Sequence, residues 1–202
     1  MEKLLLEKHI KEFTDKNFDQ FSKYFDNKFQ VFIELNHSVE EVAKCLILEY
    51  HKAAITLTNN ILGRLLKLSL FYNEVGVKPI PIESWNSVFT EPNRKYGSLP
   101  LDISIELCKK HDLIIQSEKD YLVNSLKKLI LNGYFNADPV KILEIRDGDE
   151  TEETKDDVNQ KIIPPLQSIQ IENFTRANAV RYFEFVFELI ENIERRLMEK
   201  SK

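Results

Sequence analysis

Histidine and cysteine are the residues of this chain best suited to bind a metal or to act as a base, and they are few. They are His9, His37, His51, His111, Cys45 and Cys108. One metal-binding spacing occurs: Glu34 and His37 form Glu-x-x-His, which di-iron helical bundles use in two copies. The residues three positions before the other histidines are Leu6, Leu48 and Cys108. Because the second copy is missing, we expect no metal site and no cofactor.

Motifs that mark nucleotide-dependent enzymes and hydrolases are absent from the sequence. It contains no G-x-x-x-x-G-K or G-x-G-x-x-G phosphate loop and no G-x-S-x-G nucleophile elbow. Cys45 and Cys108 have neither a metal-binding nor a redox spacing, so we expect reduced thiols in a cytoplasmic protein. Short motifs therefore point to no particular enzyme class.

The negative charge of the chain is concentrated in one segment. The net charge is −5, and residues 147–157 (DGDETEETKDD) hold seven acidic residues against one lysine. Because like charges repel and this segment has no apolar residue to bury, we expect a mobile acidic loop at roughly 146–160. It is either a solvated insertion, or an acidic lure for a basic partner or a shield against nucleic acid. The basic residues are scattered, with one short cluster at Arg94 and Lys95.

Length and composition favour a single domain over residues 1–202. A chain of 202 residues, 43% of them hydrophobic, can bury about 70% of its unfolded surface. Five glycines and seven prolines are few for a turn-rich β fold. No apolar run approaches the roughly 18 residues of a membrane span, and the first residues lack the apolar stretch of a signal peptide. We therefore expect a cytoplasmic protein with no membrane partner.

Helical periodicity is strongest over residues 39–75. Ser38 and Glu41 have the spacing of a capping box, and apolar residues recur after them every three or four positions. Gly76 is expected to end the helix. These signals predict one long central helix over 39–75.

Further helical segments are predicted around this helix. They are residues 2–13, residues 16–35, residues 99–111, a helix capped by Ser117 and closed by Gly133, and residues 176–199 capped by Thr175. In the first of them, Leu5, Leu6, Ile10 and Phe13 are expected to face inward. Residues 76–98, rich in proline and glycine, are expected to be an irregular connection. The predicted fold class is all-α: a bundle of about five to six helices with one long central helix and an acidic loop insertion.

The helix predicted over 16–35 has an aromatic repeat. Its members are Phe18, Phe21, Phe25, Phe29 and Phe32. They are interpreted as core packing against the long helix, with an exposed aromatic seam for a partner as the alternative.

The order of elements and several short segments resemble the HEPN superfamily of α-helical bundles. The segments are Tyr50-x-x-Ala53-Ala54-Ile55-x-Leu57, Ile61–Lys67, Tyr96-Gly97-Ser98-Leu99, Asp112-Leu113-Ile114, Ser117-Glu118 and Leu131–Pro139. The resemblance covers roughly residues 38–198. HEPN proteins occur widely in bacterial toxin–antitoxin and phage-defence systems and usually dimerise. The resemblance thus implies a homodimer with a protein partner from such an operon.

The resemblance also implies that this chain is not catalytic. Active HEPN members cleave RNA with an arginine followed after four to six residues by a histidine. The arginine stabilises the phosphate, and the histidine moves the proton of the attacking hydroxyl. The matching positions here are Leu131 and Asn136, and no histidine follows any arginine at that spacing. A non-catalytic interaction module is implied, in which Asn132, Tyr134, Asn136 and Asp138 line a groove for RNA, a nucleotide or a partner.

Other interpretations stay open. Asn132-Gly133 can be a simple helix C-cap, and Asn136–Pro139 a turn into the next element. The alternative function is an RNA-cleaving HEPN-type endoribonuclease with a rearranged active site, in which His111 or His51 is the base. A metal-dependent enzyme built on the bundle is a third class.

Overall fold

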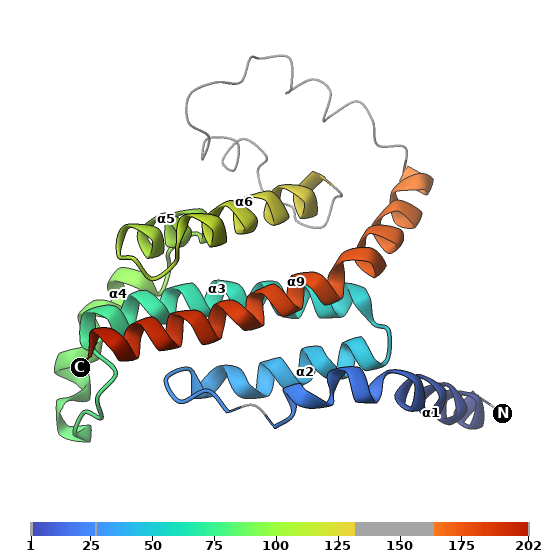
Figure 1. The fold of residues 1–202 in the computed structure, drawn as a ribbon, viewed down its shortest axis with the longest axis horizontal. Helices are drawn as coiled ribbons and strands as arrows, with labels where there is room; N and C mark the ends of the chain where they lie inside the picture. The colour runs from blue at the N-terminus through green and yellow to red at the C-terminus, as the bar shows by residue number, and fades with distance from the viewer. Residues whose placement is uncertain (1, 27, 132–163, 202) are drawn as a thin grey trace, which may run out of the picture.

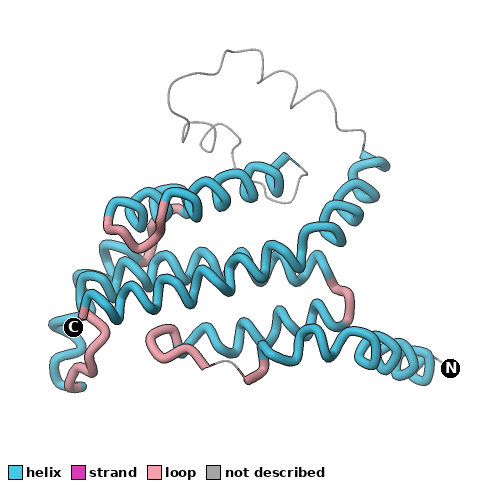
Figure 2. The backbone as a smooth tube through the Cα atoms, in the orientation of Figure 1, coloured by secondary structure: helices cyan, strands magenta, loops and turns pink. Residues whose placement is uncertain are grey.

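The computed structural model describes residues 2–26, 28–131 and 164–201, which form helices joined by short turns (Figures 1 and 2). The α-helices are α1 (Glu2–Phe21), α2 (Asn36–Ile47), α3 (His51–Val75), α4 (Trp85–Tyr96), α5 (Leu101–Lys110), α6 (Gln116–Leu131) and α9 (Pro164–Lys200). Short 3-10 turns lie at 22–24, 33–35 and 82–84. No strand occurs in this described part, so the predicted all-α bundle is confirmed, with seven helices there rather than five to six.

The two longest helices, α3 and α9, pack against each other along the middle of the fold (Figure 1). The α1–α2 pair lies on one side of them and the α5–α6 pair on the other, while α4 packs against α3. The apolar stripe predicted for the last helix faces the core. Its members are all buried: Ala179, Phe183, Val186, Ile190, Ile193 and Leu197.

The helix predicted over 39–75 is divided into α2 and α3 by a turn around Glu49. This residue has a left-handed backbone, with φ of 57°, and the N–H of Tyr50 donates to the carbonyl of Cys45 at 2.7 Å. That bond belongs to the Schellman arrangement, which ends a helix and usually uses glycine. The Glu49 carboxylate accepts a hydrogen bond from Lys16 of α1 at 2.7 Å. The contact between Lys16 and Glu49 therefore stabilises a turn that the apolar periodicity of residues 39–75 does not predict.

The capping box predicted at Ser38 and Glu41 is wrong, because α2 begins earlier, at Asn36. The 3-10 turn at 33–35 leads directly into α2, so no free helix end is left at Ser38. The side-chain oxygen of Asn36 instead accepts the N–H of Phe29 at 2.9 Å and holds the preceding loop.

The helix predicted over 2–13 is confirmed as part of α1, but Leu5, Leu6 and Ile10 are exposed rather than facing inward. The helix predicted over 16–35 is wrong beyond Phe21, where α1 ends and the chain returns irregularly. After α1, the backbone N–H groups of Gln30 and Val31 donate to the carboxylate of Glu194 in α9, not to a helical carbonyl. The core-packing interpretation of the phenylalanines is confirmed for most of them. Phe21, Phe29 and Phe32 are buried, Phe25 is half-buried, and Phe18 is exposed.

Two predicted boundaries differ from those of the structure. Residues 76–98 were expected to be irregular, yet they contain α4, whose Tyr96 hydroxyl donates to Glu74 of α3 at 2.6 Å. Thr175 is not a cap, because α9 begins before it. Its hydroxyl donates to the carbonyl of Glu172 at 2.9 Å, within the helix.

The acidic loop predicted at roughly 146–160 lies outside the described residues. Among the helices that are described, none has the length and apolarity needed to cross a membrane.

Gly63 within α3 and Gly76 directly after it provide a test of the helix assignment. Nothing lies within 4 Å of a Cβ added at Gly63, in the middle of the helix. Because alanine is favoured over glycine in a helix by about 1 kcal/mol, Gly63→Ala should raise the free energy of unfolding by about 0.5–1 kcal/mol. Urea denaturation measures this change.

Gly76→Ala is the matched control, since Gly76 ends α3 with φ of 86°. A side chain in that conformation, with φ of 86° and ψ of 168°, costs about 1–3 kcal/mol, so this variant should be less stable than the wild type. A loss of stability in Gly63→Ala would contradict the open environment described for Gly63.

Candidate functional site

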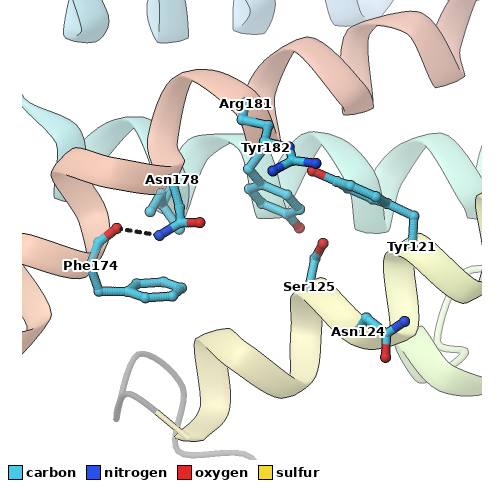
Figure 3. Close-up of a pocket in the computed structure, with 8 residues that line it drawn as sticks. Tyr121, Asn124, Ser125, Phe174, Asn178, Arg181 and Tyr182 are labelled. Carbon is cyan, nitrogen blue, oxygen red and sulfur yellow. Dashed lines mark hydrogen bonds between the residues drawn. The ribbon is translucent and has the colours of Figure 1, made fainter.

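A pocket lies between α3, α6 and α9 (Figure 3). It encloses about 220 Å³. Its lining residues come from all three helices: Ile55, Tyr121, Asn124, Ser125, Phe174, Asn178, Arg181 and Tyr182. This lining combines aromatic, amide, hydroxyl and guanidinium groups, so the pocket is the strongest candidate for a binding site in the described part of the chain.

The floor of the pocket is apolar. Ile55 of α3 is fully buried, Tyr182 is buried, and Phe174 is half-buried. The hydroxyl of Tyr182 donates to the side-chain oxygen of Asn59 at 2.6 Å, and burial raises the pKa of Tyr182. The phenol therefore stays neutral, and its proton is already used in a bond to α3.

The rim of the pocket is polar. Asn124 and Arg181 are exposed, while Ser125 and Asn178 are half-buried. The amide nitrogen of Asn178 donates to the carbonyl of Phe174 at 2.8 Å, which leaves the amide oxygen free to accept a bond from a ligand. In Figure 3 the guanidinium of Arg181 points toward the Tyr121 side of the pocket.

The position of α6 over the pocket depends on an ion pair at the start of that helix. The carboxylate of Glu118 accepts two hydrogen bonds from Arg196 of α9, at 2.7 and 2.9 Å. It also accepts bonds from the side chain of Asn192 at 3.1 Å and from the N–H of Ile115 at 2.8 Å. The last of these bonds is the capping role that a glutamate in the first helical turn can fill, so Glu118 rather than Ser117 caps α6.

A second contact between α6 and α9 lies next to the pocket. The rings of Tyr121 and Phe185 are stacked, with centroids 3.8 Å apart and an interplanar angle of 25°. Together with the Glu118–Arg196 pair, this stacking holds one wall of the pocket in place.

The residues predicted to form a polar groove, Asn132, Tyr134, Asn136 and Asp138, lie outside the described residues. The four predicted residues follow α6 in the sequence, whereas the residues that line the pocket belong to α3, α6 and α9. Sequence reasoning missed Asn124, Ser125, Asn178 and Arg181 altogether. Asn178 and Arg181 stand three residues apart beside the apolar stripe of α9, but nothing in the sequence places α6 opposite them.

The histidines lie apart from the pocket and from one another. His9 packs its ring edge-on against Phe13, with centroids 4.3 Å apart. The Nε2 atom of His37 lies 3.4 Å from a carboxylate oxygen of Glu41. Across the described residues, no group of three or more histidine, cysteine, aspartate or glutamate side chains could hold a metal ion.

His51 is the histidine with a nearby arginine. Burial lowers the pKa of His51; the charge of Glu49 opposes this shift, and the charge of Arg176 adds to it. His51 and Arg176 therefore lie close enough to interact electrostatically, although neither lines the pocket. His51 is one of the two histidines that the alternative function, an RNA-cleaving enzyme, would use as its base.

The comparisons with known proteins identify no relative. No family model matches the sequence, and no curated protein or solved structure is significantly similar to it. The resemblance to HEPN proteins therefore depends on the sequence segments quoted above.

The Glu118–Arg196 pair makes a direct prediction about stability. Arg196→Met leaves the Glu118 carboxylate nearly buried without its cation, so the free energy of unfolding should fall by about 3–5 kcal/mol. Guanidinium denaturation measures this loss.

Arg195→Met is the matched control, because Arg195 is exposed and bonds only to Asn192 in the described part of the chain. It should change stability by no more than about 0.5 kcal/mol. Equal stabilities of the two variants would show that the pair does not hold α6 to α9.

Proposed function

We propose that this chain is a non-catalytic, HEPN-like helical interaction module that acts in a bacterial toxin–antitoxin or phage-defence setting. The sequence resemblance supports the family, and Leu131 and Asn136 in place of arginine and histidine support the lack of catalysis. The observation that carries the interaction role is the exposed, leucine-rich first half of α1.

The first half of α1 extends past the end of α2 (Figure 1). Every side chain from Lys3 to Glu12 is exposed, including Leu4, Leu5 and Leu6 at 74%, 61% and 53%. Large apolar side chains gathered in this way are typical of a protein–protein contact. Leu6, Ile10 and Phe13 also share one face of the helix, at steps of four and three residues.

The proposed occupant of this face is a second copy of the chain. The Leu6–Phe13 face continues to Asn17, whose side chain donates to the carbonyl of Ile47 in α2 at 2.9 Å. A partner helix would thus extend the contact that α2 already makes. Residues 2–13 hold three acidic residues and three lysines, so two copies of this neutral segment do not repel each other. A protein from the same operon would then use the surfaces that the homodimer leaves open.

Light scattering coupled to size-exclusion chromatography tests the homodimer. At micromolar concentration the wild type should have the mass of two chains, and a Leu6→Glu/Ile10→Glu variant should have the mass of one. Charged side chains on the shared face would be buried without partners, which disfavours association.

The control for charge is Lys8→Ala/Lys11→Ala. It makes the net charge more negative by the same amount, yet leaves Leu6 and Ile10 unchanged, so it should remain dimeric. A monomeric wild type would contradict the role proposed for α1. So would equal masses for the Leu6→Glu/Ile10→Glu variant and the Lys8→Ala/Lys11→Ala control.

The second candidate function is the RNA-cleaving enzyme with a rearranged active site, in which His51 is the base and Arg176, whose charge contributes to lowering the pKa of His51, is the cation. A base and a phosphate-binding cation are the minimum for cleavage through the 2′-hydroxyl. His51 begins α3, directly after the α2–α3 turn, and Arg176 lies in α9.

An assay of the purified protein on total RNA separates the two functions. The proposed module should leave the RNA intact. Cleavage that is lost in His51→Ala and in Arg176→Ala, or in His111→Ala, would establish the enzyme and overturn the non-catalytic proposal. Cleavage that persists in all three variants would indicate a contaminating nuclease.

A further inference from the structure

We propose that the pocket between α3, α6 and α9 binds the C-terminal residue of a protein partner, with the carboxylate of that residue at Arg181. Capture of a C-terminal carboxylate is a recurring mode of peptide recognition. Such a pocket would be one surface through which the chain holds its partner, so the proposal rests on the proposed function of an interaction module. It does not depend on the homodimer or on the exposed face of α1.

The cationic group of the pocket is Arg181. The other arginines of α9, Arg176, Arg195 and Arg196, each have an acceptor on α9 itself or on α6. Among the described residues, no acceptor lies within hydrogen-bond or ion-pair distance of Arg181, and the pocket lining contains no acidic side chain. A guanidinium offers two parallel donors that match the two oxygens of a carboxylate. The pocket therefore selects an anion.

The donors of the pocket favour a carboxylate over a phosphate. The lining residues lie within helices, where each backbone N–H already bonds to the preceding turn. Phosphate sites commonly use the free N–H groups of a helix N-terminus or of a turn. One guanidinium balances the single charge of a carboxylate, whereas a phosphate group carries about 1.5–2 charges at pH 7. In Figure 3 the Tyr121 and Ser125 hydroxyls lie on the Arg181 side of the pocket and add neutral donors there.

The side chain of Asn178 suits the N–H of a peptide bond. Its amide nitrogen donates to the carbonyl of Phe174 at 2.8 Å, so its oxygen remains to accept a bond from a ligand. Asn178 and Arg181 stand three residues apart, which makes them neighbours on the surface of the helix. The N–H and the carboxylate of a C-terminal residue are neighbours in the same way.

The same groups disfavour a free amino acid. A free amino acid has an ammonium group where a C-terminal residue has its peptide N–H, and a buried ammonium needs an anionic partner. The pocket lining offers no carboxylate for that purpose. The end of a polypeptide chain therefore fits these groups better than the corresponding free amino acid does.

The floor and the size of the pocket define the last residue of the partner. Ile55 and Tyr182 are buried and Phe174 is half-buried, and the hydroxyl of Tyr182 is already bonded to Asn59. An apolar side chain meets this floor without losing hydrogen bonds. The volume of about 220 Å³ is below the roughly 300–1,000 Å³ of sites for drug-sized molecules. It therefore holds one residue, and the preceding residues of the partner lie outside the rim.

Isothermal titration calorimetry tests the proposal with the peptide acetyl-alanyl-alanyl-alanyl-leucine. With a free C-terminal carboxylate it should bind in the micromolar to millimolar range. The same peptide with a C-terminal carboxamide should bind about ten- to hundredfold more weakly, because it lacks the charge that pairs with Arg181. A peptide that ends in aspartate should also bind more weakly, since its side chain would meet the apolar floor. Free leucine and AMP are the probes for an amino acid and a phosphate ligand, and both should bind more weakly than the peptide.

Two variants and a control locate the site. In Arg181→Met, the carboxylate and carboxamide peptides should bind with equal affinity, whereas Arg195→Met, with the same loss of charge on the same helix, should keep the preference for the carboxylate. Because this ratio compares two peptides on one protein, a general loss of stability does not produce it. Ser125→Phe, which fills the pocket and leaves Arg181 in place, should abolish the binding of both peptides.

Four results would overturn the proposal. They are no heat of binding with the carboxylate peptide at millimolar concentration, equal wild-type affinity for the carboxylate and the carboxamide, a preserved preference in Arg181→Met, or tighter binding of free leucine or AMP than of the peptide. A monomeric wild type or cleavage of RNA would instead contradict the proposed function, and neither is measured in this titration. The two failures are therefore distinguishable.

Discussion

The Glu118–Arg196 pair sets the position of α6, and through it the geometry of the candidate pocket. Their side chains are 9% and 18% exposed, and a carboxylate this far from water is unfavourable unless its oxygens are fully bonded. Four donors meet that requirement: two from Arg196, one from Asn192 and the N–H of Ile115. Because the pair joins the first turn of α6 to the last turns of α9, the two helices run antiparallel from this point.

Arg196 extends this constraint to the turn before α6. It donates to the carbonyl of Leu113 at 2.8 Å. That turn contains Asp112, with φ of 54°, and the N–H of Leu113 donates to the carbonyl of Cys108 at 2.9 Å. Arg196 therefore contacts both the turn and the start of α6, while Lys200 of the same helix donates to the carbonyl of His111 at the end of α5.

The pocket also depends on the shape of α9. This helix bends where Phe174 and Asn178 lie, and its first turns lean away from α3 (Figures 1 and 3). The side chains of Thr175 and Asn178 both donate to carbonyls of their own helix there, a pattern that often bends helices. The same bend presents Phe174 and Asn178 to the pocket, so a local backbone feature and the candidate site share their residues.

Sequence reasoning succeeded where burial follows one helix at a time. The stripe from Ala179 to Leu197 is buried because an apolar face at a spacing of 3.6 residues needs no knowledge of its partner. It failed at Glu49, since a glutamate in the left-handed conformation ends α2 where glycine would be expected. It also failed at Phe21–Phe32, where Glu194 supplies the acceptor that lets the chain leave the helix.

The pocket could not be predicted from the sequence, because it depends on contacts between residues far apart in the chain. Asn124 and Arg181 come from helices separated by a long stretch of chain. Those helices are brought together by contacts such as the pairing of Glu118 with Arg196, 78 residues apart, and the stacking of Tyr121 on Phe185. No local sequence pattern predicts a contact between residues so far apart in the chain. The exposed apolar face of α1 is the opposite case, because the sequence shows its leucines but does not show that they are exposed.

Hydrogen–deuterium exchange of the wild type and Glu118→Gln, compared helix by helix, tests the central claim most directly. If the Glu118–Arg196 pair holds α6 on the α3–α9 core, exchange should accelerate at residues 113–126, while the middle of α3 and of α9 stays as slow as in the wild type. Unchanged exchange in α6, or equal acceleration in all helices, would contradict the account.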